Sequence, residues 1–211
     1  DHAVLEKKGF LLVDSGATYM DGTTDITRTY PLGPLTEDEK RFYTWTLQSH
    51  IDLAKAVWLD YCECKMIDTI AREPLWRHLI NYRCGTGHSV SFVGNVHEGP
   101  HALNSRNTTR MRPGMVVTDE PGVYETDLVG IRIENELVCV HKADNQYGTF
   151  LGFEPLMFVP IATSPILPGV LDKDEIAWLN DYHRQVFAKL APHLNDEERS
   201  WLAEKCAAIG C

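Results

Sequence analysis

The stretch "VDSGATYMDGTTDITRTYPLG", residues 13–33, decides how the fold is interpreted. It follows the apolar run Phe10–Val13 and places Asp14 and Asp25 among residues that favour strands and tight turns. Strand interiors are depleted in Asp, so two acids at the ends of neighbouring strands suggest a hairpin that presents them to one place. A solvated loop would tolerate the same composition, and the rest of the chain has to separate the two interpretations.

The turn of this hairpin sets the distance between the two acids. A turn at Asp21–Gly22, the favoured two-residue loop, leaves Asp14 about 13 Å from the position opposite Asp25. A turn centred between Tyr19 and Met20 places the two acids directly opposite each other, with Cα atoms about 5 Å apart. A shared metal site therefore predicts an irregular turn here.

A second acidic pair lies in "VVTDEPG" and "GIRIENE". A short loop around Thr126–Leu128 puts Glu120 and Glu134 opposite each other on one face of a second hairpin. Pro121 biases Glu120 toward an extended conformation. Carboxylates are seldom buried without a partner, so two such pairs among apolar strand residues indicate a common site.

Histidine completes the candidate donor set. His88 follows two glycines in "GTGHSV", where a side chain at a turn can point into a cavity, and His97 follows in "NVHEGPH". A lone histidine is more often an ordinary core or surface residue, but four converging carboxylates favour a ligand role for His88. Four carboxylates and an imidazole suit Mn²⁺ and similar ions, and that number of ligands suits two ions.

Composition narrows the class of protein. The 211 residues carry a formal net charge of −10 with no basic cluster, which argues against nucleic acid as a partner. No apolar run approaches the length of a membrane span, so no membrane partner is expected. The six cysteines are too dilute for a disulfide scaffold and fit reduced thiols in a cytoplasmic protein.

Hydrophobic periodicity predicts an α+β fold, with helices covering one face of an antiparallel sheet. A capping box at Thr36 begins a helix that we expect to reach about Leu59, and a second helix, kinked or restarted at Pro74, covers 66–80. The remaining expected elements are strands at 115–118, 123–124 and 131–140, an apolar run at 156–161, and helices at 172–191 and 195–208.

Four motifs in order, "DSGATYMDGTTDITRT", "GTGHSVSFVGNVHEGP", "VVTDEPGVYE" and "GIRIENE", resemble the pita-bread metallopeptidases. The resemblance covers nearly the whole chain and is strongest to Xaa-Pro aminopeptidases of the cytosolic type. It implies the pita-bread (creatinase/aminopeptidase) fold, a curved antiparallel sheet with helices on one face, in a chain that lacks the N-terminal part of that fold. Residues 1–152 would form the larger, C-terminal part of the catalytic domain. Residues 153–211 would add a strand and two helices packed on it.

The resemblance also implies a role for each candidate residue. The metal ligands would be Asp14, Asp25, His88, Glu120 and Glu134. The catalytic residues would be Glu120 as the general base, His97 as a stabiliser of the tetrahedral intermediate and Arg132 as a support through hydrogen bonds. The expected cofactors are two divalent ions, Mn²⁺ first and Zn²⁺ or Co²⁺ as alternatives.

The activity implied is hydrolysis of the Xaa-Pro bond at the N-terminus of peptides, by a water or hydroxide between the two ions. The expected partners are peptides with proline at position two, a second copy in a homodimer of the full-length enzyme, and the missing N-terminal part of the fold in cis or as another chain. Two alternatives remain open: a proline dipeptidase, and a non-catalytic peptide- or protein-binding fragment of the same fold.

Overall fold

The computed structural model describes residues 4–210 and confirms the expected order of a hairpin, two helices, further strands and a helical tail. The strands are β1 (Phe10–Tyr19), β2 (Gly22–Pro31), β3 (Val57–Leu59), β4 (Gly87–His88), β5 (Ala102–Leu103), β6 (Val116–Asp119), β7 (Gly122–Glu125), β8 (Val129–Arg132), β9 (Asn135–Asn145) and β10 (Gly148–Pro155). The helices are α1 (Glu37–Ala54), α2 (Cys64–Trp76), α3 (Lys173–Leu190), the short 3₁₀ helix η1 (Ala191–His193) and α4 (Asp196–Lys205).

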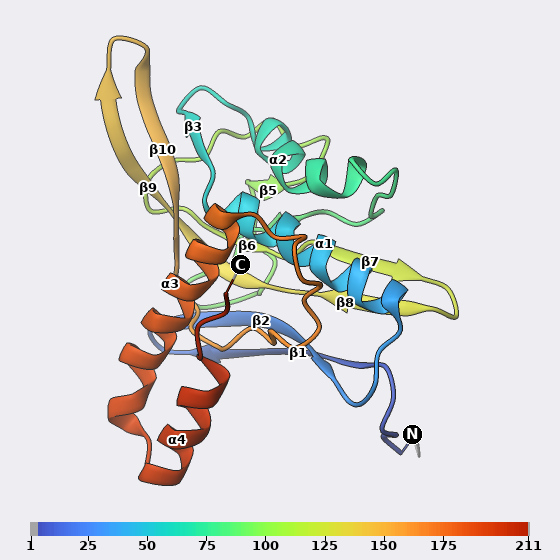
Figure 1. Cartoon of the computed structure of the whole chain (residues 1–211). Coiled ribbons are helices and arrows are strands. Elements are labelled where there is room, and N and C mark those ends of the chain that lie inside the picture. Colours follow the sequence, from blue (N-terminus) through green and yellow to red (C-terminus); the bar gives the residue numbers. More distant parts are fainter. Residues whose placement is uncertain (1–3, 211) are drawn as a thin grey trace.

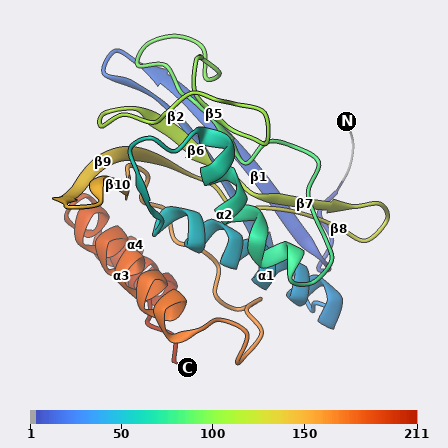
Figure 2. The ribbon, with the colours of Figure 1, turned by 90° about the horizontal axis from the view of Figure 1, so that it is seen from above.

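The strands form antiparallel ladders, with β1 on β2, β7 on β8, β4 on β5, and the order β3-β10-β9-β6 in the largest. Figure 2 shows the helices gathered on one side of the strands, and Figure 1 shows α1 and α2 above the β1–β2 hairpin. The α+β expectation is therefore confirmed.

The register of the β1–β2 hairpin differs from the sequence-based expectation. Asp14 lies opposite Thr27, Asp25 lies opposite Gly16, and the turn consists of Met20 and Asp21 with uninterrupted pairing on either side. The irregular turn and the direct Asp14–Asp25 pairing were both wrong, because a two-residue turn matches the twist of the strands better. The offset of two residues keeps both acids on one face of the hairpin.

Predicted limits of several elements also change, among them those of the first helix and of the expected strand 131–140. Helix α1 ends at Ala54 and not near Leu59, because Val57–Leu59 pairs with β10 and buries Trp58 against Phe153. The expected strand 131–140 is divided between β8 and β9, because Glu134 donates its backbone N–H to Thr27 of β2.

The apolar run 156–161 is not a strand either. The carbonyl groups of Val159 and Pro160 accept hydrogen bonds from the Arg28 side chain, where a strand would pair with a neighbouring strand. The segment leads into α3 and α4. Both helices begin with a capping box, at Asp172 and Asn195, and carry acidic residues in the first turn.

The helical tail packs on α1. Leu179 and Val186 of α3 share a buried cluster with Leu47 and Ile51 of α1. The same cluster includes Ile133, which lies between β8 and β9. Among the described residues, no helix has the length and apolarity needed to cross a membrane.

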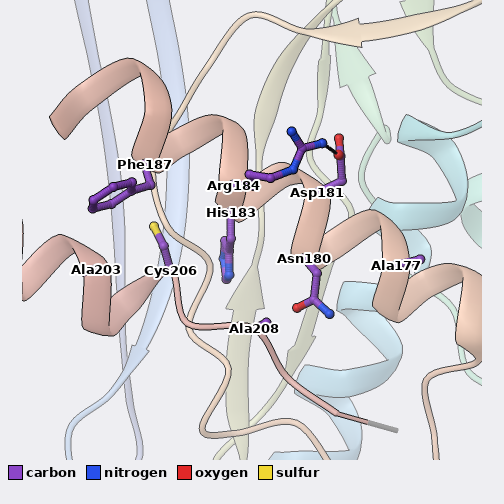
Figure 3. A pocket seen from close by; sticks show the side chains of 9 residues that line it. All are labelled: Ala177, Asn180, Asp181, His183, Arg184, Phe187, Ala203, Cys206 and Ala208. Carbon is purple, nitrogen blue, oxygen red and sulfur yellow. Dashed lines mark hydrogen bonds and ion pairs between the residues drawn. The ribbon is translucent and has the colours of Figure 1, made fainter. Parts of the chain in front are cut away.

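His183 of α3 is fully buried beside a groove of about 580 Å³ between α3 and the C-terminal segment (Figure 3). Its Nε2 accepts the backbone N–H of Ile161 at 3.1 Å. Burial, with the nearby charge of Arg28 as a smaller cause, lowers the pKa of His183 to about 4. None of the candidate metal-site residues lines this groove.

This histidine predicts an acid-sensitive fold. Between pH 6.5 and 4 the unfolded chain takes up a proton at residue 183 and the folded chain does not, so stability falls as the pH falls. At pH 5 the loss is about 2 kcal/mol. His183→Gln, whose Oε1 can accept the same N–H, should reduce the difference in unfolding free energy between pH 7 and pH 5 by about that amount in urea titrations. His141→Gln, in the exposed β9–β10 hairpin, should not change it, and equal pH dependence in the wild type and His183→Gln would contradict the assignment.

Candidate metal centre

Three separate parts of the chain bring Asp25, His88 and Glu134 together. They come from β2, from β4 and from the link between β8 and β9, and each offers a ligand atom within 4.8 Å of the others. Asp25 and Glu134 are buried and His88 is half-buried. Two carboxylates and an imidazole at this spacing are donors that can hold a divalent cation.

Gly87 explains how His88 enters the site. A Cβ at position 87 would lie 1.8 Å from the carbonyl oxygen of Thr118, so only glycine allows β4 to approach β6 this closely. The imidazole Nδ1 lies 3.1 Å from the carbonyl oxygen of Ser89 and donates to it. Nε2 is then left to face the carboxylates, which is how metal-binding histidines are usually held.

Glu120 lies directly against His88. Its Oε1 is 3.1 Å from His88 Nε2 and accepts a hydrogen bond of 2.9 Å from the hydroxyl of Thr118. The β7–β8 pairing is centred on Asp127, which takes the left-handed conformation with φ 59°. The loop expected around Thr126–Leu128 is therefore confirmed, and extending the register places Glu120 opposite Glu134.

Asp14 lies at the edge of this group and outside the cluster of three. Its side chain is half exposed, and its Oδ2 accepts a 2.5 Å hydrogen bond from Nη2 of Arg132. Nη1 of Arg132 donates to the hydroxyl of Tyr124, also at 2.5 Å. Asp14 is thus paired with the guanidinium of Arg132.

Thr27 connects Arg132 to the buried glutamate. Nε of Arg132 donates to Thr27 Oγ1 at 3.0 Å, and that hydroxyl donates to Oε2 of Glu134 at 2.5 Å. The arginine therefore orients a second acid through one hydroxyl. The contact between Nε of Arg132 and the carboxylate oxygen Oε2 of Glu120 is longer, at 3.9 Å.

His97 comes from the exposed loop that follows His88. The two imidazole rings lie 3.8 Å apart between centroids, tilted by 46°. His97 is exposed to solvent at the mouth of the site. Because it contacts a residue of the cluster and still faces solvent, a bound peptide can reach it.

The crowded acids change the proton affinities of the site. Burial, followed by the charges of Glu120, Asp25 and Asp14, raises the pKa of Glu134 to about 8. Burial alone would lower the pKa of His88, but hydrogen bonds with Asp25 and Glu120 outweigh it and raise that pKa to about 10. Both shifts show that this group of carboxylates favours a positive charge in its midst.

Three residues of the site were not identified from the sequence. Thr27 and Tyr124 contact Arg132, and each follows an identified acid by an even number of strand positions, a signal that could have placed them on the same face. The third is Glu136, which is buried and whose pKa burial raises to about 7. It lies two positions beyond Glu134, so strand alternation could have found it as well.

The donor set fits a divalent cation. The cluster of three is rich in oxygen, and Glu120 contacts its imidazole. Burial and the neighbouring acids raise the pKa of Glu134, so a metal ion would compete with a proton for this carboxylate. No thiol is among these donors, which favours ions that prefer oxygen and imidazole.

Two sequence profiles identify the family to which the chain belongs. The sequence profile of metallopeptidase family M24 matches residues 1–141, and the profile of the C-terminal region of peptidase M24 matches residues 149–209. The chain belongs to metallopeptidase family M24, which confirms the resemblance seen in the sequence motifs.

Among known proteins, the chain is similar to enzymes that act before proline. It is 41% identical over 217 residues to a probable Xaa-Pro aminopeptidase P of Coprinopsis cinerea, covering 99% of this chain and 35% of that protein. It is 41% identical over 214 residues to aminopeptidase P1 of Lotus japonicus, covering 99% of this chain and 32% of that protein. The chain thus spans about a third of the length of these relatives.

A solved structure gives the same result in three dimensions. The X-prolyl aminopeptidase of Caenorhabditis elegans, described as a cytosolic enzyme with a di-nuclear active site, matches with a TM-score of 0.89 and 40% sequence identity. The match covers 94% of this chain and 33% of that one. The expected pita-bread fold is therefore confirmed.

Proposed function

We propose that this chain carries the metal centre of an aminopeptidase that hydrolyses the Xaa-Pro bond at the N-terminus of peptides. The observation that carries the proposal is the convergence of Asp25, His88 and Glu134 within 4.8 Å, with Glu120 in contact with the histidine. Similarity to Xaa-Pro aminopeptidases over nearly the whole chain supports the choice of substrate.

The proposed metal ligands are Asp14, Asp25, His88, Glu120 and Glu134, holding two divalent ions. Such ions lower the pKa of a water molecule toward neutrality and polarise the carbonyl that it attacks. Mn²⁺ is the proposed metal because the donors are mostly carboxylates, with Zn²⁺ or Co²⁺ as alternatives.

The chain's own groups then have separate tasks. Glu120, oriented by the Thr118 hydroxyl, accepts the proton of the attacking water. His97, exposed at the mouth of the site, donates a hydrogen bond to the oxygen of the tetrahedral intermediate. Arg132 holds Asp14 directly and Glu134 through Thr27. The Xaa-Pro amide lacks an N–H, so this chemistry does not depend on one.

Several further properties belong to the same proposal. The full-length protein would be a cytoplasmic homodimer that acts on peptides with proline second, and the remainder of the fold would complete the substrate site. The catalytic part of this chain would end at residue 152. Residues 153–211 would form an extension held on α1 by contacts such as Tyr43 to Ala162 and Gln48 to Glu175.

The test is release of the first residue from an Xaa-Pro-Yaa tripeptide by metal-stripped protein, before and after Mn²⁺ is restored. We expect turnover only after metal is added, at least about 100-fold above the stripped sample. Cleavage of an Xaa-Pro dipeptide, with no cleavage of the tripeptide, would favour a proline dipeptidase. A folded protein that binds Mn²⁺ and cleaves neither peptide would support the binding-fragment alternative.

A further inference from the structure

A layer of buried polar side chains lies directly behind the metal centre and is not explained by the proposed chemistry. Its members are Arg28 of β2, His50 of α1, Asp119 of β6, Asn135 of β9 and Tyr182 of α3. They come from five elements of the fold and are all at least nine-tenths buried. Polar groups are expensive to bury, so a continuous layer of them requires a reason.

Arg28 is the centre of this layer. It is 4% exposed, and no carboxylate is among its hydrogen-bond acceptors in the described residues. Its guanidinium donates instead to the carbonyl oxygens of Thr27, Glu134, Val159 and Pro160, and to the side chains of Asn135 and Tyr182. The planar fork thereby joins the β1–β2 hairpin, the link between β8 and β9 that carries Glu134, and the segment before α3.

The tyrosine hydroxyl connects α3 to the same point. Tyr182 Oη accepts from Arg28 Nη2 at 2.9 Å, and its own proton has three acceptors within reach, Met157 O at 3.0 Å, Val159 O at 3.1 Å and Asn135 Oδ1 at 3.2 Å. It also accepts the backbone N–H of Val159 at 3.2 Å. The ring is stacked on Trp178 of the same helix, with centroids 5.4 Å apart. The helix outside residues 1–152 therefore reaches the residue next to a proposed metal ligand.

The side-chain amide of Asn135 fixes which atoms donate and which accept hydrogen bonds in the rest of the layer. Its Oδ1 accepts from Arg28 at 2.8 Å, so its Nδ2 must be the atom that faces His50, 3.3 Å from Nε2. His50 then accepts at Nε2 and carries its proton on Nδ1. That N–H lies 3.2 Å from the carbonyl oxygen of Asp119 and donates to it, with the Asp119 carboxylate 3.0 Å from the same nitrogen.

The two ends of the layer lie beside the two proposed glutamate ligands. Asp119 precedes Glu120, and Asn135 follows Glu134. We infer that the layer is a positioning device, in which Tyr182 and Arg28 hold Asn135, and His50 holds Asp119, so that both glutamates keep the spacing that metal binding requires. The inference rests on the proposed metal site and adds that α3 controls its affinity. Outer groups of this kind commonly change metal affinity 10- to 100-fold.

The chain contains a matched pair of tyrosines for the test. Tyr182→Phe removes only the hydroxyl from the layer. Tyr43→Phe removes a hydroxyl that is equally buried and that donates to the carbonyl oxygen of Ala162 in the same connecting segment, at 2.7 Å, and not to a member of the layer. His50→Gln is a second variant, which changes the layer at its other end, beside Asp119.

The measurement is Mn²⁺ affinity of the 211-residue chain by electron paramagnetic resonance titration, with the visible absorption spectrum of bound Co²⁺ as a report on ligand geometry. We expect Tyr182→Phe and His50→Gln to bind Mn²⁺ at least about 10-fold more weakly and to change the Co²⁺ spectrum. Tyr43→Phe should match the wild type in both, whatever its melting temperature.

The outcomes separate the inference from the proposed function. A wild-type chain that binds no Mn²⁺ would overturn the metal centre itself. A wild type that binds Mn²⁺, with Tyr182→Phe and His50→Gln unchanged in affinity and spectrum, would overturn the positioning layer alone. Equal weakening in Tyr182→Phe and Tyr43→Phe would also overturn it, because the effect would then be general loss of packing.

Discussion

Replacing Glu120 with Gln is expected to lower kcat for an Xaa-Pro-Yaa tripeptide by about 1000-fold or more. The amide keeps the size of the side chain and can still accept the hydrogen bond from Thr118. It can neither take a proton from the attacking water nor match a carboxylate as a ligand. Loss of a general base alone costs 100- to 10,000-fold, and weaker metal binding adds to that.

The measurement is steady-state hydrolysis of the tripeptide at saturating Mn²⁺. Glu125→Gln is the matched control, because it removes an exposed carboxylate from the same hairpin, on β7. A Glu120→Gln protein that retains a tenth of the wild-type kcat would contradict the role assigned to this residue. Loss of activity in both variants would point to the charge of the hairpin and not to one acid.

Glu134→Gln should lower Mn²⁺ affinity by about 100-fold or more and yet leave the metal-free fold as stable as the wild type, or more stable. Burial and three neighbouring acids raise the pKa of Glu134 to about 8. Near pH 7 the metal-free carboxyl therefore keeps its proton, and a neutral amide imitates it. Since the unfolded chain ionises near its ordinary pKa, wild-type stability falls as the pH rises from about 4.5 to 8, and the variant escapes that loss.

Urea unfolding with and without Mn²⁺ checks both halves of this prediction. At a Mn²⁺ concentration 100 times its dissociation constant, the wild type should gain about 2.7 kcal/mol and the variant much less. Glu154→Gln, at an exposed position of β10, should behave as the wild type. A Glu134→Gln chain that gains the full wild-type stabilisation from Mn²⁺ would remove Glu134 from the ligand set.

Local patterns predicted much of the fold. The capping box at Thr36, the helices that begin at Lys173 and Asp196 and the hairpin centred on Asp127 are as the sequence indicates, because each depends on residues a few positions apart. The end of α1 could not be predicted in the same way. Continuous helical periodicity runs past Ala54, and only pairing with β10, far along the chain, makes Val57–Leu59 a strand.

The candidate site likewise has a part that could be predicted from the sequence and a part that could not. Acids and histidines that interrupt apolar strands stand out in the sequence, since burying them needs a partner. The register of the first hairpin cannot be seen in the sequence in this way. Turns that differ in position by one or two residues satisfy the same side-chain pattern, and the choice between them depends on backbone twist. Asp14 accordingly lies opposite Thr27, and that register places Thr27 beside both Arg132 and Glu134.

The sequence by itself thus determined which side chains are candidates for the site: four carboxylates from two hairpin sequences and the imidazole of His88, in a chain of metallopeptidase family M24. Only the tertiary structure decided what holds those donors in place. Arg28 and Tyr182 resemble an exposed cation and a core aromatic when taken alone, and they meet across a separation of 154 residues. No local propensity or periodicity encodes a contact of that range, because it forms only when hairpin, helix and connecting segment are packed together.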